Sequence, residues 1–147
     1  MATAHDIAAY ILKRRGPLSA MKLEKLVYYS QAWSLVWDDH PLFTDKIEAW
    51  ANGPVVPVLY EKHRRQFKLD EWPTGDPAAL DATAVETIDL VLDAYADQNA
   101  QTLSDLTHLE APWRDARLGL TSGERGDREI TQASMMEYYS SLPHSAS

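Results

Sequence analysis

The sequence predicts a mainly α fold, a single compact helical domain with a small two-stranded β element. Three observations support this fold class. Apolar residues recur at helical spacing in most segments, helix-capping residues flank those segments, and only one short stretch has the character of extended chain. The chain has 147 residues, of which 45% are hydrophobic, which is enough for one domain with a real core. We expect this domain to cover residues 1–142 and a flexible tail to cover residues 143–147.

The first two helices have clear boundaries. Thr3 is a suitable N-cap for a helix over residues 4–15, and a Gly-Pro pair follows that helix. Ser19 is expected to cap a second helix over residues 20–38. Apolar residues cover such a wide arc of the second helix that it should lie at the centre of the domain.

The extended stretch comes next. Residues 42–43 and 47–50 are expected to form two short paired strands. A Gly-Pro pair at 53–54 then makes a rigid corner, because glycine tolerates positive φ and proline fixes its own φ. Pro57 suits the first turn of a helix over residues 56–65.

The second half of the chain predicts four further helices. The first of them should begin at a capping box formed by Thr83 and Glu86. Its expected inward face is Val85, Ile88, Val91, Leu92 and Tyr95. The other expected segments are a loop over residues 67–82, a helix over 103–108 capped by Thr102, a helix with Pro112 in its first turn, a mobile loop over 119–127 and a last helix over 131–142.

Charge is distributed unevenly. The net charge is −8, yet residues 1–68 carry ten Lys or Arg and seven Asp or Glu. Residues 69–113 carry ten carboxylates and no Lys or Arg. Such an acidic stretch repels a phosphate backbone, so we expect no direct nucleic-acid partner. It suits either a basic protein partner or a solvated face.

The chain contains no cysteine, which excludes disulfides, thiol catalysis and cysteine-ligated zinc. No apolar run approaches about 20 residues, so we expect no membrane partner. The N-terminus lacks a basic region before an apolar one and therefore does not have the pattern of a secretion signal. Together these features predict a cytoplasmic protein.

The polar cluster with the clearest catalytic potential contains Thr107, His108 and Glu110. The His-x-Glu spacing occurs in zinc deaminases, but the further cysteine ligands of that chemistry are missing, so we expect no metal and no cofactor. The three side chains also suit a small hydrolase or transferase, although no nucleophile elbow or phosphate loop accompanies them. We prefer a buried hydrogen-bond network that caps helix ends, and we expect no enzymatic activity.

Three blocks of the sequence resemble the Panacea domain of SocA-like bacterial and phage antitoxins. Residues 21–31 contain Lys-Leu-x-Lys-Leu-x-Tyr, residues 41–60 contain Gly-Pro-Val-Val-Pro, and residues 103–116 contain Thr-His-x-Glu-x-Pro-Trp. The block residues expected to hold the fold are Lys25, Tyr28, Trp50, Gly53, Pro54, Val55, Pro57, Thr107, His108, Glu110, Pro112 and Trp113.

The resemblance implies a mostly helical Panacea-like fold and direct neutralisation of a toxin encoded nearby, by protein–protein binding. It also implies an alternative, because a SocA-type member acts as an adaptor that delivers its toxin to a protease. We expect the more variable surfaces to select the toxin. The first candidate surface is Glu86, Asp89, Asp93 and Asp97, and the second is Lys62, Arg64 and Arg65.

Overall fold

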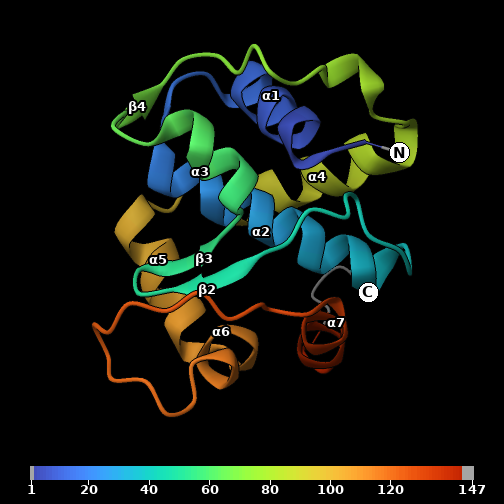
Figure 1. Cartoon of the computed structure of the whole chain (residues 1–147). Helices are drawn as coiled ribbons and strands as arrows, with labels where there is room; N and C mark the ends of the chain where they lie inside the picture. The colour runs from blue at the N-terminus through green and yellow to red at the C-terminus, as the bar shows by residue number, and fades with distance from the viewer. Residues whose placement is uncertain (1, 144–147) are drawn as a thin grey trace.

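A computed structural model describes residues 2–143 and confirms the mainly α fold (Figure 1). The helices are α1 Ala4–Arg15, α2 Ala20–Trp37, α3 Pro57–His63, α4 Ala82–Tyr95, α5 Ala100–Leu109, α6 Ala111–Ala116 and α7 Gln132–Ser140, with a 3-10 turn η1 at Pro77–Ala79. The strands are β1 Leu18–Ser19, β2 Glu48–Trp50, β3 Gly53–Val55 and β4 Lys68–Leu69. Of the tail predicted over residues 143–147, all but the first residue lie outside the described part of the chain.

Helix α2 forms the centre of the molecule, as its wide apolar arc predicted. It packs against α1, α4, α5, α7 and β3, and Figure 1 shows it crossing the middle of the fold. Every residue over 23–35 is buried, including five polar or charged ones. Buried polar groups need partners, and those of Glu24, Lys25 and Gln31 lie in other segments, which they tie to the helix.

The predicted pairing of residues 42–43 with 47–50 is wrong. Residues 42–43 are not a strand, because a buried side chain of α2 satisfies their backbone groups. The Gln31 carbonyl accepts from the N–H of Leu42 at 2.8 Å, and its amide donates to the carbonyl of Phe43 at 2.8 Å. Glutamine offers both a donor and an acceptor, so it replaces the neighbouring strand that this segment would otherwise need.

Strand β2 pairs instead with β3, through a two-residue turn at Ala51 and Asn52. The Gly-Pro pair therefore lies inside a hairpin and does not make the expected corner. Gly53 does adopt a positive φ of 122°, as its position suggested. A second small sheet, β1 with β4, was not predicted.

Two helix starts differ from the prediction for one reason. Asp81 caps α4 by accepting from the N–H of Ala84, so the expected capping box at Thr83 does not form. Asn99 likewise caps α5 in place of the expected Thr102. In both cases an earlier side-chain oxygen reaches the free N–H groups of the first turn. Ser19 caps α2 as predicted.

The segment after α6 lies along the free edge of β2. Arg117 donates hydrogen bonds to the carbonyls of Ala49, Thr121 and Glu124. The N–H of Ala49 in turn donates to the carbonyl of Arg128 at 2.8 Å. These bonds hold residues 119–127 beside the hairpin. No bilayer-spanning helix occurs within residues 2–143.

Candidate functional site

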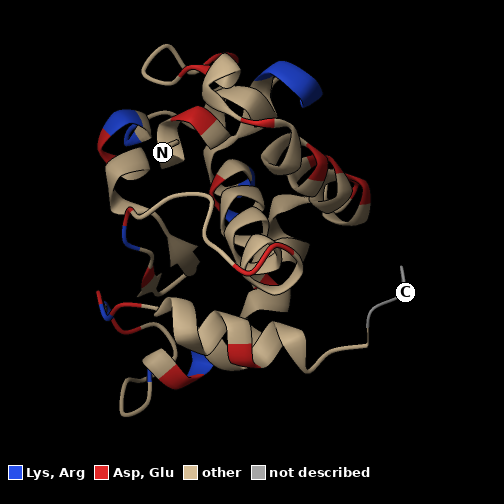
Figure 2. Cartoon of the chain, turned by 90° about the vertical axis from the view of Figure 1, so that its right-hand side faces the viewer, with Lys and Arg blue, Asp and Glu red and all other residues tan. Residues whose placement is uncertain are grey.

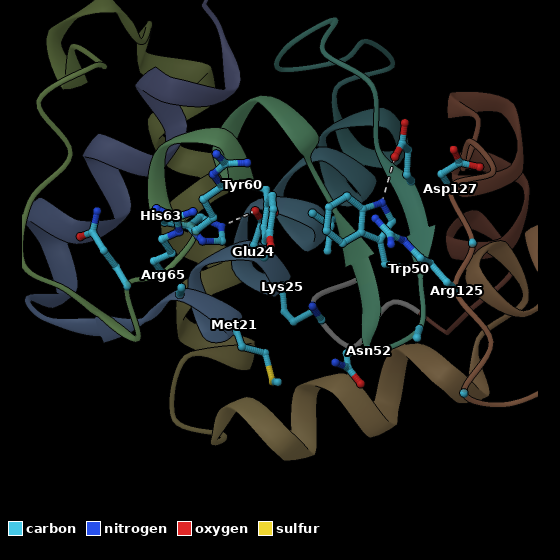
Figure 3. Close-up of a pocket in the computed structure, with 18 residues that line it drawn as sticks. Met21, Glu24, Lys25, Trp50, Asn52, Tyr60, His63, Arg65, Arg125 and Asp127 are labelled. Carbon is cyan, nitrogen blue, oxygen red and sulfur yellow. Dashed lines mark hydrogen bonds and ion pairs between the residues drawn. The ribbon is translucent and has the colours of Figure 1, made fainter.

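A pocket of about 820 Å³ opens between α2, the β2–β3 hairpin, α3 and residues 123–127 (Figure 3). This volume falls in the range of roughly 300–1,000 Å³ that is typical of small-molecule sites. Figure 3 shows Lys25 pointing into the pocket, with Trp50 and Asn52 on one side and Met21 on the other. Two residues from different sequence blocks, Lys25 and Trp50, therefore line one cavity.

Lys25 is the most unusual side chain in the pocket, because it is a lysine with only 1% of its surface exposed. Its ammonium group donates to the carbonyl of Pro54 at 3.2 Å. Burial removes water from the charged form and lowers the pKa of Lys25 to about 8, and the nearby charge of Glu24 opposes that shift. The amine is therefore a cation at neutral pH, held in a largely dry position.

Gly53 creates the space that the Lys25 side chain occupies. A Cβ atom at Gly53 would lie 2.5 Å from Cε of Lys25 and 3.1 Å from Oγ1 of Thr107. Thr107 is fully buried and donates to the carbonyl of Ser104 at 2.6 Å. The three sequence blocks thus meet around one lysine, since each contributes one member of this contact.

Glu24 precedes Lys25 in α2 and is also buried, but it serves a different group. One carboxylate oxygen accepts from the N–H of Val56 at 2.8 Å. The other lies 2.7 Å from Nε2 of His63. Glu24 therefore joins α2 to both ends of α3, and neither of its oxygens pairs with Lys25.

Two aromatic rings form one wall of the pocket. The rings of Trp50 and Tyr60 pack edge to face, with centroids 4.8 Å apart. The indole N–H of Trp50 donates to Glu48 at 2.9 Å, which fixes the ring. The pocket is also lined by Arg64, Arg65, Arg125 and Asp127. In Figure 3 Arg125 and Asp127 lie at one end of the pocket and His63 and Arg65 at the other.

Glu110 lies outside this pocket, in a cluster of tyrosines. Its carboxylate accepts from the hydroxyls of Tyr29 and Tyr139, each at 2.7 Å. The hydroxyl of Tyr28 lies 3.0 Å from that of Tyr139 and extends the cluster. Burial raises the pKa of Glu110, and the two tyrosine hydrogen bonds oppose that shift. The cluster joins α2 to α7.

His108 has a third and separate environment. Its ring stacks on Trp113, with centroids 4.0 Å apart, and the indole of Trp113 donates to the carbonyl of Trp50 at 2.8 Å. Nε2 of His108 is buried without a partner among the described residues. Burial lowers the pKa of His108, so the ring favours its neutral form.

Thr107, His108 and Glu110 therefore do not form the single network that we expected. Each makes its own contacts, and none of the three lines the pocket. Their near-adjacency in sequence is misleading, because α5 ends at Leu109 and the chain turns sharply into α6. Within residues 2–143 no group of three or more His, Asp or Glu side chains is placed to hold a metal ion.

The other block residues lie within or beside secondary structure. Pro57 and Pro112 occupy the first turns of α3 and α6, as predicted. Pro54 and Val55 are buried in β3, and Val55 also lines the pocket. That the block residues hold the fold stays a prediction.

The four acidic positions of the first candidate surface are Glu86, Asp89, Asp93 and Asp97. Asp89 accepts a hydrogen bond from Tyr10 at 2.6 Å and lies 3.4 Å from Arg14. Asp97 lies 3.1 Å from Arg15. Half of this surface is thus engaged by α1, while the other two carboxylates are exposed. Figure 2 shows acidic residues as red bands spaced along the helices.

The second candidate surface lies beside the pocket. Lys62, Arg64 and Arg65 are exposed, and Arg64 and Arg65 line the pocket mouth. Within the described residues these three side chains form no ion pair, unlike Asp89 and Asp97 of the acidic surface. Phe67 follows them with 76% of its surface exposed.

Several pocket residues escaped the sequence interpretation. Glu24 and His63 are 39 positions apart, and no pattern links them before the chain folds. Arg125 and Asp127 lie in residues 119–127, for which the sequence predicts only a mobile loop. One signal was available in the sequence, namely the two adjacent charged residues Glu24 and Lys25 inside the most apolar helix. Burying a charged side chain costs free energy unless a partner compensates it, so such residues indicate a specific site.

Comparison with known proteins gives one match. Residues 23–114 match the protein family described as antitoxin SocA-like, Panacea domain. No curated protein and no solved structure matches the chain. The matched region covers more than half of the sequence and includes most of α2, the hairpin, the pocket lysine and the first residues of α6. The chain belongs to the SocA-like antitoxin family and contains its Panacea domain.

Proposed function

We propose that this protein is the antitoxin of a toxin–antitoxin system and neutralises its toxin by direct protein–protein binding in the cytoplasm. The family match over residues 23–114 carries the proposal. The buried positions of most block residues support it further, because a scaffold held from inside leaves its surface free to select a partner.

We propose the surface beside the pocket as the toxin-binding site. It combines Lys62, Arg64 and Arg65 with the exposed rings of Tyr60 and Phe67. Arginine and aromatic side chains are enriched among the residues that dominate the binding energy of protein interfaces. A toxin with an acidic, partly apolar patch fits this chemistry.

The acidic surface on α4 is the weaker candidate. Asp89 and Asp97 already have cationic partners on α1, so a toxin would have to compete with those contacts. Glu86 and Asp93 alone make a small, solvated pair of charges, and solvated charges contribute little to affinity.

Co-expression with the product of the adjacent gene tests the proposal. The wild-type chain is expected to restore growth and to co-purify with that product. Arg64→Glu combined with Arg65→Glu should abolish both, whereas Glu86→Lys combined with Asp93→Lys should leave both intact. Loss of rescue only in the second pair would move the binding site to α4.

Toxin half-life separates binding from delivery to a protease. Direct neutralisation leaves the half-life of the toxin unchanged or longer when the antitoxin is present. A shorter half-life that depends on a cellular protease would replace direct neutralisation with adaptor action. Failure of the wild-type chain both to rescue growth and to co-purify would reject the antitoxin role.

A further inference from the structure

The ammonium group of Lys25 uses little of its bonding capacity inside the protein. An ammonium can donate three hydrogen bonds, and within residues 2–143 Lys25 makes one, to the carbonyl of Pro54. The adjacent carboxylate of Glu24 is committed to Val56 and His63. A nearly dry cation therefore points into the pocket with donors left for a further acceptor.

The pocket is locally cationic in a chain whose net charge is −8. Its basic lining residues besides Lys25 are Arg64, Arg65 and Arg125, and none of these three forms an ion pair within the described residues. Its acidic lining residues are Glu24, Glu48 and Asp127. Glu24 contacts His63 and Glu48 accepts from Trp50, so among these three carboxylates Asp127 alone has no partner within residues 2–143.

The same pocket offers a flat apolar wall. Trp50 is fixed by its hydrogen bond to Glu48 and packs edge to face with Tyr60. An aromatic wall with a cation at the floor is complementary to a molecule that has a planar ring at one end and an anionic group at the other. Met21 and Val55 add apolar lining.

We propose that this pocket binds a small ring-bearing oxyanion, a carboxylate or a phosphate ester, whose charged group pairs with Lys25 and whose ring packs against Trp50. The structure of the site explains why Gly53 and a buried lysine occur together. Gly53 leaves the space through which the aliphatic part of the lysine reaches the pocket floor, and a larger residue would displace the amine.

Ligand binding is tested by NMR titration of the complete chain with three probes that share a phenyl ring. Benzoate and phenyl phosphate carry the two kinds of oxyanion, and benzamide is the neutral counterpart of benzoate. We expect at least one anion to shift the indole N–H resonance of Trp50, and benzamide to bind at least tenfold more weakly. The stronger of the two anions identifies the ligand class.

Variants test the role of the amine. Lys25→Met keeps a long apolar side chain without the charge and should weaken binding of the preferred anion at least tenfold. Lys13→Met removes an exposed lysine from α1 and should bind like the wild type. Arg125→Gln in the exposed loop provides an independent second test, and it should weaken binding of the preferred anion threefold or more.

Three outcomes would overturn the proposal. They are binding of benzamide as strong as that of the anions, unchanged anion binding by the Lys25 or Arg125 variant, and absence of a Trp50 shift with all three probes. The titration contains only this chain, so its result is independent of whether the protein neutralises a toxin.

Discussion

Replacing Lys25 by methionine should stabilise the protein at neutral pH. Burial lowers the pKa of Lys25 from 10.5 to about 8. Each pKa unit corresponds to about 1.4 kcal/mol, so the buried charge costs about 3 kcal/mol at pH 7. Loss of the hydrogen bond to Pro54 removes about 1 kcal/mol of stabilisation. The expected net gain is about 2 kcal/mol, or about 4–8 °C in melting temperature for a chain of this size.

The stability gained by Lys25→Met should decrease as pH rises. Between the folded pKa of about 8 and the unfolded value of 10.5, the unfolded chain binds a proton that the folded chain lacks. Wild-type stability therefore rises with pH in that window, relative to a variant without the lysine. The advantage of Lys25→Met should fall to about zero by pH 9.5, because roughly 2 kcal/mol of the charge penalty has then been relieved.

Urea unfolding followed by tryptophan fluorescence, at several values between pH 7 and 9.5, measures this difference. Burial raises the pKa of Tyr28, Tyr29 and Tyr139 in both proteins, so the contribution of these tyrosines to the pH dependence cancels in the comparison. A Lys25→Met variant that is less stable than wild type at pH 7 would contradict this prediction. A stability difference that stays the same from pH 7 to pH 9.5 would contradict it as well.

Three further predictions concern the other block residues. Gly53→Ala should lower the free energy of unfolding by at least about 2 kcal/mol, because alanine is strained at the positive φ of this position and its Cβ would collide with Lys25. Gly119 also has a positive φ but open space around it, so Gly119→Ala should lower the free energy of unfolding by only about 1 kcal/mol in the same urea assay. Glu110→Gln should be more stable than wild type at pH 7. Burial raises the pKa of Glu110, so as pH falls the folded wild type takes up a proton before the unfolded chain does and gains stability. The melting temperatures of the two proteins should therefore converge towards pH 5. A constant difference between the melting temperatures would contradict this prediction. His108→Ala should lose about 1 kcal/mol of stacking energy while growth rescue persists, and lost rescue at an unchanged melting temperature would instead indicate a functional histidine.

Much of the fold could be predicted because its signals are local. The start of α1 and its end at Arg15 agree with the prediction, and Ser19 caps α2 as expected. Capping depends on atoms three residues apart, and amphipathic spacing depends on neighbouring turns, so both are visible in a short window of sequence. The two wrongly predicted caps also concern local contacts. Asp81 and Thr83 both lie within one turn of the start of α4, as Asn99 and Thr102 do for α5, and the earlier residue makes the cap in each case.

The mainly helical fold class, the central position of α2 and the resemblance of the three blocks to a family could all be predicted from the sequence. Packing of the folded chain fixed where the block residues lie. It placed Lys25, Gly53 and Thr107 in one contact, separated His108 from Glu110, and built a pocket with residues that no motif marks. The physical reason is that periodicity and capping act within a few residues. A pocket, or a buried contact such as that between Glu24 and His63, depends instead on which distant side chains packing brings within a few ångströms.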